Sequence, residues 1–264
     1  MIERVSVIIS VIVIATLLYI IFKNRRKPQK HVPLLQNNDR NILVQYIPFY
    51  VELNAKERAN FEERIHRFLS SVHITGVNTD IERLDELFIA VSAIIPVFSF
   101  DNWEYMNLNE VLLYPGSFDQ QFNQEGEDRT RAGLVGDGPY QNVMVLSRPD
   151  LRAGFLQTES RSNTGLHEFV HLIDKTDGAI DGIPESLLEE EYREGWHNLV
   201  LQNIQLIRQE QSDIDVYGAT NRAEFFAVIS EYFFKQPDQL QHNHPELFLM
   251  LSRIYNYRFS EKKK

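Results

Sequence analysis

The 264-residue chain has no cysteine, which excludes disulfide bonds, thiolate metal sites and a cysteine nucleophile. It is also short of basic residues, with 27 Lys and Arg against 37 Asp and Glu, for a formal net charge of -10. Because an acidic chain repels phosphate backbones, we expect no nucleic-acid partner. The apolar and charged fractions, 43% and 24%, are typical of a globular protein with a sizeable core.

An uncharged hydrophobic run occupies residues 5–22. As a helix at 1.5 Å per residue it would be about 27 Å long, enough to cross a bilayer core. The alternative is a cleaved signal peptide, but no basic n-region or A-x-A-like cleavage site is evident. We therefore predict a transmembrane anchor over residues 1–22, a basic and polar linker over 23–42, and one folded domain over 43–264.

Basic residues directly after this run predict its orientation. They are Lys23, Arg25, Arg26, Lys27 and Lys30, whereas Arg4 alone precedes the run. Under the positive-inside rule such a cluster stays in the cytoplasm. The expected location is the inner (cytoplasmic) membrane, crossed once, with the folded domain on the cytoplasmic side.

The rest of the chain combines helical and strand-like patterns. Apolar residues at helical spacing predict helices at about 54–72, 80–95, 164–175, 185–210, 221–235 and 244–257. Short apolar runs ended by turn residues predict strands at 110–114 and 142–147. The predicted fold class is α+β, mostly helical with a small sheet.

Residues 167–171 form the motif His-Glu-x-x-His. Residues four apart on a helix differ by about 40° in azimuth, so His167 and His171 project from one face and can share a metal ion. Glu168 lies beside the first ligand and can accept the proton of a zinc-activated water. The alternative is a helix whose histidines are exposed or satisfied in the core. Its apolar neighbours argue against this, because polar side chains there need a partner.

A catalytic zinc usually takes three protein ligands and leaves one position open. Glu224 and Glu231 lie seven residues apart on the hydrophobic helix predicted at 221–235, on nearly the same face, so spacing does not separate them. Either acid could instead form a structural ion pair. Asp174, three residues after His171, is predicted to orient a ligand imidazole. A solvent-exposed acid at the helix end is the alternative.

Several segments make the chain resemble a known family. HEFVHLID at 167–174 and YGATNRAEFFAVISEYFF at 217–234 resemble motifs of the Mlc titration factor A family of zinc peptidases. YPGSF at 114–118 and DGIPE at 181–185 are also similar to that family. The likeness runs from about residue 45 to residue 250, and its motifs occur in the family's order.

The resemblance implies a zincin-like fold with a strand edge beside the zinc helix. It implies His167, His171 and Glu224 as Zn²⁺ ligands and Glu168 as the general base. It also implies Tyr217 as a polar group aimed at the substrate oxyanion. The chain departs from the family at Val170, where members have Ala, and at Arg222, where members often have Pro. The N-terminal hydrophobic run is a third departure.

These features favour a zinc-dependent peptidase, and the resemblance suggests aminopeptidase-like or short-peptide substrates. The alternative from another class is a membrane-tethered regulatory protein that sequesters a transcriptional regulator or another partner, for which an acidic surface is suited. The intact set of His, Glu and Tyr residues favours catalysis. A zinc hydrolase acting on other substrates is a third interpretation.

Overall fold

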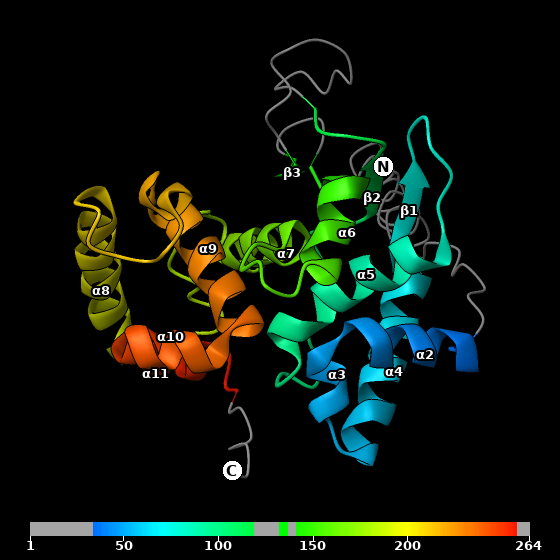
Figure 1. Ribbon diagram of the computed structural model, residues 1–264, viewed down its shortest axis with the longest axis horizontal. Helices are drawn as coiled ribbons and strands as arrows, with labels where there is room; N and C mark the ends of the chain where they lie inside the picture. Colours follow the sequence, from blue (N-terminus) through cyan, green and yellow to red (C-terminus); the bar gives the residue numbers. More distant parts are fainter. Residues whose placement is uncertain (1–33, 119–131, 137–140, 258–264) are drawn as a thin grey trace, which may run out of the picture.

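A four-stranded sheet lies at one side of the computed structural model, which describes residues 34–118, 132–136 and 141–257 (Figure 1). The strands are β1 (His73–Gly76), β2 (Glu110–Tyr114), β3 (Gly133–Val135) and β4 (Val143–Ser147), in the order β1-β2-β4-β3. The first three strands of that order are parallel, and β3 runs antiparallel to β4. Among the described strands β3 therefore pairs only with β4 and forms an edge.

Both predicted strands, at 110–114 and 142–147, are confirmed as β2 and β4. Strands β1 and β3 were not predicted. They have four and three residues, which is too short for an alternating pattern to stand out from the surrounding loops.

Helices from the N-terminal part of the chain pack with the sheet, and we call this region, residues 34–156, the sheet half. The helices are α2 (Asn37–Tyr46), α3 (Pro48–Glu52), α4 (Ala55–Ser71), α5 (Arg83–Ile94) and α6 (Arg148–Leu156). The side chain of Asn54 accepts hydrogen bonds from the backbone of Lys56 and Glu57 and so caps α4. A short 3-10 turn containing Pro96 follows α5. The predicted helices at 54–72 and 80–95 are thus confirmed.

A second group of helices, which we call the helical half, follows residue 189. It comprises α8 (Glu190–Arg208), α9 (Arg222–Lys235), α10 (Pro237–Asn243) and α11 (Pro245–Ile254). Its own hydrophobic cluster includes the fully buried rings of Trp196, Phe226 and Tyr255. Three helices were predicted here, and the structure adds the short α10.

Helix α7 (Thr164–Asp174) lies between the two halves (Figure 1). Leu166, Phe169 and Leu172 of this helix pack into the cluster of the sheet half, while Val170 packs into that of the helical half. The side chain of Asn163 caps the helix by accepting a hydrogen bond from the backbone of Leu166 at 3.0 Å. Its position makes α7 the element that both halves share.

The predicted transmembrane helix at residues 1–22 lies outside the described residues. Within the described ranges, no helix has the length and apolar character needed to cross a membrane. The predicted linker at 23–42 differs from the structure at its end, because α2 begins at Asn37. The buried carboxylate of Asp39 pairs with Arg83 of α5 at 3.0 Å. This distant partner, which local polarity does not reveal, holds the polar start of α2 within the folded domain.

Candidate metal centre

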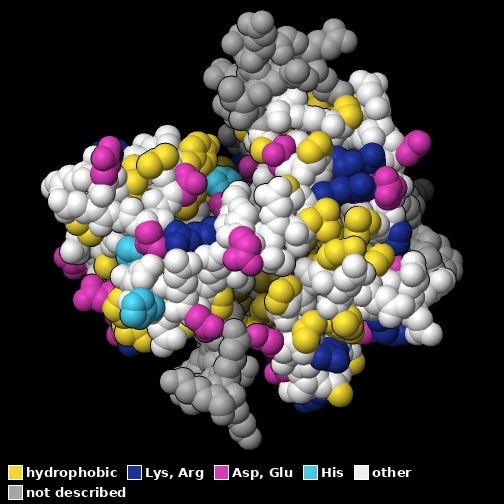
Figure 2. All heavy atoms as spheres, viewed as in Figure 1, with side chains coloured by type: hydrophobic (Ala, Val, Ile, Leu, Met, Phe, Trp, Pro, Cys, Tyr) yellow, Lys and Arg dark blue, Asp and Glu magenta, His cyan; other side chains and the backbone are white. Residues whose placement is uncertain are grey.

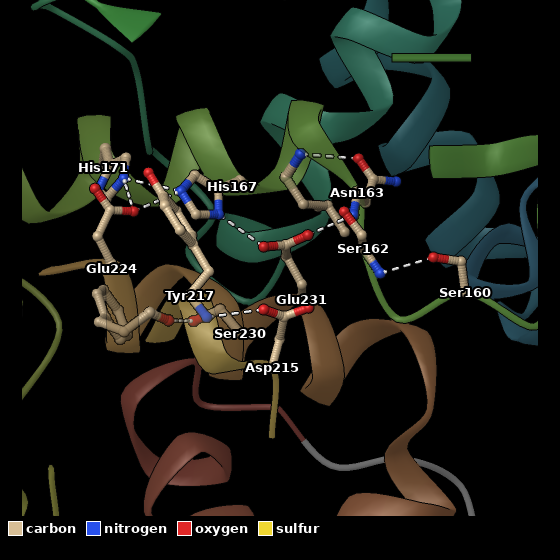
Figure 3. Close-up of polar contacts among 12 residues, drawn as sticks. Ser160, Ser162, Asn163, His167, His171, Asp215, Tyr217, Glu224, Ser230 and Glu231 are labelled. Carbon is tan, nitrogen blue, oxygen red and sulfur yellow. Dashed lines mark hydrogen bonds and ion pairs between the residues drawn. The ribbon is translucent and has the colours of Figure 1, made fainter. Parts of the chain in front are cut away.

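Three side chains from α7 and α9 meet at one point (Figure 3). Nε2 of His167 lies 3.1 Å from Nε2 of His171 and 2.9 Å from Oε2 of Glu224. Nε2 of His171 lies 3.3 Å from Oε2 of Glu224, so the three atoms form a triangle. For metal–ligand bonds of about 2.0–2.1 Å, two corners of a tetrahedron lie about 3.3 Å apart. The three atoms therefore have the spacing of three corners around a single metal ion, and they lie within 4.8 Å of one another.

Local structure produces this arrangement. Both histidines are buried on one face of α7, as residues four apart on a helix must be when one face is covered. Glu224 lies in the first turn of α9, where Asn221 caps the helix by accepting a hydrogen bond from the backbone of Glu224 at 2.9 Å. Burial favours a raised pKa for Glu224, but hydrogen bonds from His167 and His171 outweigh it and lower that pKa.

Glu231 approaches His167 from the opposite side of the ring. Its Oε1 lies 2.7 Å from Nδ1 of His167, and its Oε2 accepts a hydrogen bond from the backbone N–H of Asn163. With a metal ion bound at Nε2, Nδ1 of His167 would carry the proton that Glu231 accepts. The two acids that helical spacing could not separate thus differ in which nitrogen of His167 they contact.

Asp174 forms no hydrogen bond with an imidazole among the described residues. Its Oδ2 accepts a hydrogen bond from the backbone N–H of Gly182 at 2.8 Å. Among the described residues, its Oδ1 and the Nδ1 of His171 have no hydrogen-bond partner. Asp174 is the last residue of α7, so its carboxylate faces the loop that follows. The carboxylate that contacts Nδ1 of a histidine in this centre is that of Glu231, and the orienting role of Asp174 stays a prediction.

Glu168 is enclosed between α7 and the sheet edge. Its side chain is buried, with 6% of its surface exposed, and Gly133 of β3 lies directly against it. A Cβ atom at position 133 would be 2.4 Å from Oε1 of Glu168, so a larger residue would displace the carboxylate. Burial raises the pKa of Glu168, although His167 and His171 oppose the shift. A carboxylate of raised pKa in this position is suited to accept a proton.

Tyr217 extends towards the same cluster from the 3-10 turn η4 (Val216–Ala219), which precedes α9 (Figure 3). Its ring centroid is 5.9 Å from that of His167, and 52% of its surface is exposed. Asp215 accepts a hydrogen bond from the backbone N–H of Tyr217 at 2.8 Å, and Gly218 is buried behind it. The chain thus turns tightly over residues 216–219 immediately before it enters α9.

A cavity of about 950 Å³ opens over these residues. Its walls are the edge strand β3, the loop containing Ile180 and Asp181, and the start of α9 with Arg222 and Ala223. Figure 2 shows histidine atoms in a recess between the helical half on the left and the rest of the molecule. Asp181, Arg222 and Ala223 lie in segments that resemble family motifs, but the sequence did not indicate that they line a cavity with β3, because that depends on contacts between distant segments.

Comparison with known proteins places the chain in a class. Residues 21–256 match the model of a family described as glucose-regulated metallo-peptidase M90. The chain is 32% identical over 228 residues to the uncharacterized protein slr2042 of Synechocystis sp., covering 81% of this chain and 82% of that protein.

Two further relatives bear the name Mlc titration factor A. The relative from Salmonella choleraesuis is 30% identical over 255 residues, covering 89% of this chain and 92% of its own length. The relative from Salmonella arizonae is 30% identical over 233 residues, covering 82% of this chain and 90% of its own length. The chain thus belongs to the M90 metallo-peptidase family, and the resemblance to Mlc titration factor A is confirmed.

Proposed function

We propose that this protein is a zinc-dependent peptidase in which His167, His171 and Glu224 are the ligands. The observation that carries the proposal is the triangle of three ligand atoms next to the buried carboxylate of Glu168. Two imidazoles and one carboxylate are a common ligand set of catalytic zinc in peptidases. Family membership supports the same reaction class.

The chain's own residues have distinct roles in the proposed reaction. Zinc at this site would supply a Lewis acid and an acidified water for attack on a peptide carbonyl. Glu168 takes up the proton of that water and delivers it to the leaving amine. Tyr217 donates a hydrogen bond to the carbonyl oxygen as negative charge develops there. Glu231 holds the ring of His167 with Nε2 directed to the ligand position.

The edge strand β3 offers a place for the substrate backbone. It lines the cavity directly above Glu168, and an extended peptide can pair with an exposed strand edge through main-chain hydrogen bonds. The cavity volume is in the range of small-molecule sites. This supports short peptides, or the end of a longer peptide, as substrates, with an aminopeptidase-like preference as the resemblance suggests.

The test combines metal content with hydrolysis of short peptides by the purified full-length protein. We expect about one zinc per chain and a chelator-sensitive activity. Glu168→Gln should retain zinc and lose about 10²–10⁴-fold in kcat, because the proton acceptor is removed while the ligands stay. Glu246→Gln, an exposed position on α11, is the matched control. Full activity in Glu168→Gln would contradict the mechanism, and loss of zinc would place Glu168 among the ligands.

A second candidate function is binding of a regulatory protein. The name of the Salmonella relatives refers to titration of Mlc, and the net charge of -10 favours a basic partner. Zinc-loaded Glu168→Gln, mixed with purified Mlc, should then form a complex with Kd in about the micromolar range or tighter. Absence of a complex at higher concentrations would exclude Mlc as the partner.

We further propose that residues 1–22 anchor the protein in the cytoplasmic membrane, with residues 43–264 in the cytoplasm. The hydrophobic run and the basic cluster after it support this. A C-terminal reporter that is active only outside the cytoplasm would contradict the orientation. Extraction of the full chain from membranes by carbonate or salt would contradict the anchor.

A further inference from the structure

Two arginines line the cavity among the described residues, and their surroundings differ. Arg161 is fully engaged within the protein. Its Nη2 donates to Oδ2 of Asp213 at 2.8 Å and its Nε donates to Gln236 at 3.1 Å. Its guanidinium also lies 4.1 Å from the ring centroid of Tyr232. The charge of Arg161 is therefore neutralised and its position fixed by residues of the fold.

Arg222 is held by a neutral partner instead. Its Nη1 lies 3.0 Å from Nδ1 of His197. Because arginine can only donate, that nitrogen of His197 must be the unprotonated acceptor of the imidazole. The hydrogen bond orients the guanidinium without neutralising its charge.

The acid next to Arg222 does not form a close ion pair with it. Oδ2 of Asp181 lies 3.7 Å from Nη2 of Arg222, beyond hydrogen-bond distance, and the two side chains are 39% and 36% exposed. Oδ1 of Asp181 accepts a hydrogen bond from the backbone N–H of Ile183 at 3.1 Å. An exposed pair at this separation contributes little, so a ligand carboxylate can compete with Asp181 for the guanidinium.

The place of Arg222 in its helix also needs an explanation. It is the first residue of α9, two positions before Glu224. This position favours proline, because the N–H that proline lacks has no partner within the helix there. It also favours acidic residues, because a positive charge is repelled by the positive end of the helix dipole. Helix formation therefore does not account for an arginine here, whereas a role in the cavity does.

We propose that Arg222 binds a carboxylate of the peptide substrate. The proposal rests on the peptidase function proposed above and adds a substrate class, peptides with a negative charge close to the scissile bond. A guanidinium held along one edge still presents other N–H groups, which suit the planar, two-point recognition of a carboxylate. The carboxylate belongs either to the C terminus of a short peptide or to an acidic side chain.

Binding of matched peptides tests the proposal without turnover. The protein is zinc-loaded full-length Glu168→Gln, and calorimetry measures the Kd of each peptide. The first pair is a tripeptide with uncharged side chains and a free C-terminal carboxylate, and the same tripeptide with a C-terminal amide. A second pair of amidated peptides carries Glu or Gln at one position. In at least one pair the acid should bind about 10- to 100-fold more tightly, as expected for hydrogen bonds to a charged group. The pair that shows the difference identifies the source of the carboxylate.

Variants assign the difference to Arg222. Adding Arg222→Gln should abolish the preference for the peptide with the carboxylate. The Kd of its partner without that carboxylate (the amide, or the Gln peptide) should stay unchanged, which also shows that the site remains intact. Arg222→Lys should restore the preference in part, because it keeps the charge but not the planar fork. Asp181→Asn should tighten binding of the acid only, by removing its competitor. This variant serves as the test if Arg222→Gln does not fold.

Two results would overturn the proposal. The first is that, in both pairs, the peptide with the carboxylate and its partner without it bind with equal affinity. The second is that the preference for the carboxylate persists in Arg222→Gln. Failure of the peptidase function gives a different pattern. A wild-type protein that hydrolyses peptides but does not distinguish acid from amide refutes the role of Arg222 alone. One that binds acids through Arg222 but hydrolyses nothing refutes the peptidase assignment alone.

Discussion

The two halves of the molecule contribute different kinds of group to the candidate site. The sheet half provides backbone and shape, through the edge strand β3 and the close contact of Gly133 with Glu168. The helical half and the turn before α9 provide chemically active side chains, which are Tyr217, Arg222, Glu224 and Glu231. Helix α7 adds its histidines and Glu168 from between them. A metal ion held by the three ligand atoms would connect α7 to the helical half, while the sheet half forms one wall of the cavity.

Removing the carboxylate that joins α9 to α7 should have the largest effect. Glu224→Ala leaves two histidines, too few for a tight catalytic zinc site. Loss of a group that only holds a ligand in place lowers metal affinity by about 10–100-fold, and loss of a ligand should lower it by more. Competition with a chromophoric chelator measures the zinc affinity. Tight zinc in Glu224→Ala combined with loss of zinc in Glu231→Ala would exchange the roles of the two acids.

Removing one hydroxyl from the helical half should affect catalysis but not binding. Tyr217→Phe keeps the ring beside His167, so zinc content, Tm and KM should change little. If the hydroxyl stabilises the oxyanion, kcat should fall by about 10–10³-fold. A normal kcat in a folded, zinc-loaded variant would remove Tyr217 from the mechanism.

A smaller effect is expected for the carboxylate behind His167. Glu231→Gln keeps an oxygen that can accept from Nδ1 of His167 but loses its charge. We expect zinc affinity to fall by about 10–100-fold, with the number of zinc ions per chain unchanged at saturating metal. Affinity equal to that of the wild type would mean that Glu231 only supports the start of α7 through its contact with Asn163.

The smallest effect concerns the end of α7. Burial raises the pKa of Asp174 to about 7, although the hydrogen bond from Gly182 opposes the shift. Because the folded state then binds this proton more tightly than the unfolded state, stability falls as pH rises from the ordinary value of 3.8 towards 7.

Asp174→Asn removes this titration and keeps an acceptor for Gly182. In metal-free protein its Tm should therefore decrease less between pH 5 and pH 8 than that of the wild type. Each kcal/mol of stability corresponds to about 2–4 °C in a domain of this size. Identical pH dependence in the two proteins would show that the raised pKa of Asp174 is not a determinant of stability.

Local features of the site were predictable from the sequence, and long-range ones were not. Helical spacing alone puts His167 and His171 on one face, because their relative position depends only on α7. It could not distinguish Glu224 from Glu231, since the distinction depends on which side of the His167 ring each acid reaches across the helix–helix contact. The family resemblance favoured Glu224, whose position the structure now describes.

Other parts depended on contacts that no local pattern encodes. Asp174 was placed on the histidine face by spacing, but at the last residue of α7 the loop after it offers a closer partner. The contact of Gly133 with Glu168 and the hydrogen bond between His197 and Arg222 join segments far apart in the chain. The longer helices followed from apolar periodicity and two of the strands from apolar runs ended by turn residues, whereas α2, α3, α6, α10 and the three-residue edge strand were not predicted.

Gly182 connects the elements that surround the site. Its N–H donates to Asp174 at the end of α7, its carbonyl accepts from the indole of Trp196 on α8 at 2.7 Å, and its φ is 80°. A Cβ atom here would be 2.3 Å from the carbonyl oxygen of Arg222. A different residue at 182, or a loop of different length, would displace the first turn of α9, and with it both Arg222 and Glu224. One loop position thus governs the placement of both the candidate metal ligand Glu224 and the cavity residue Arg222, so that a change there would move the two side chains together.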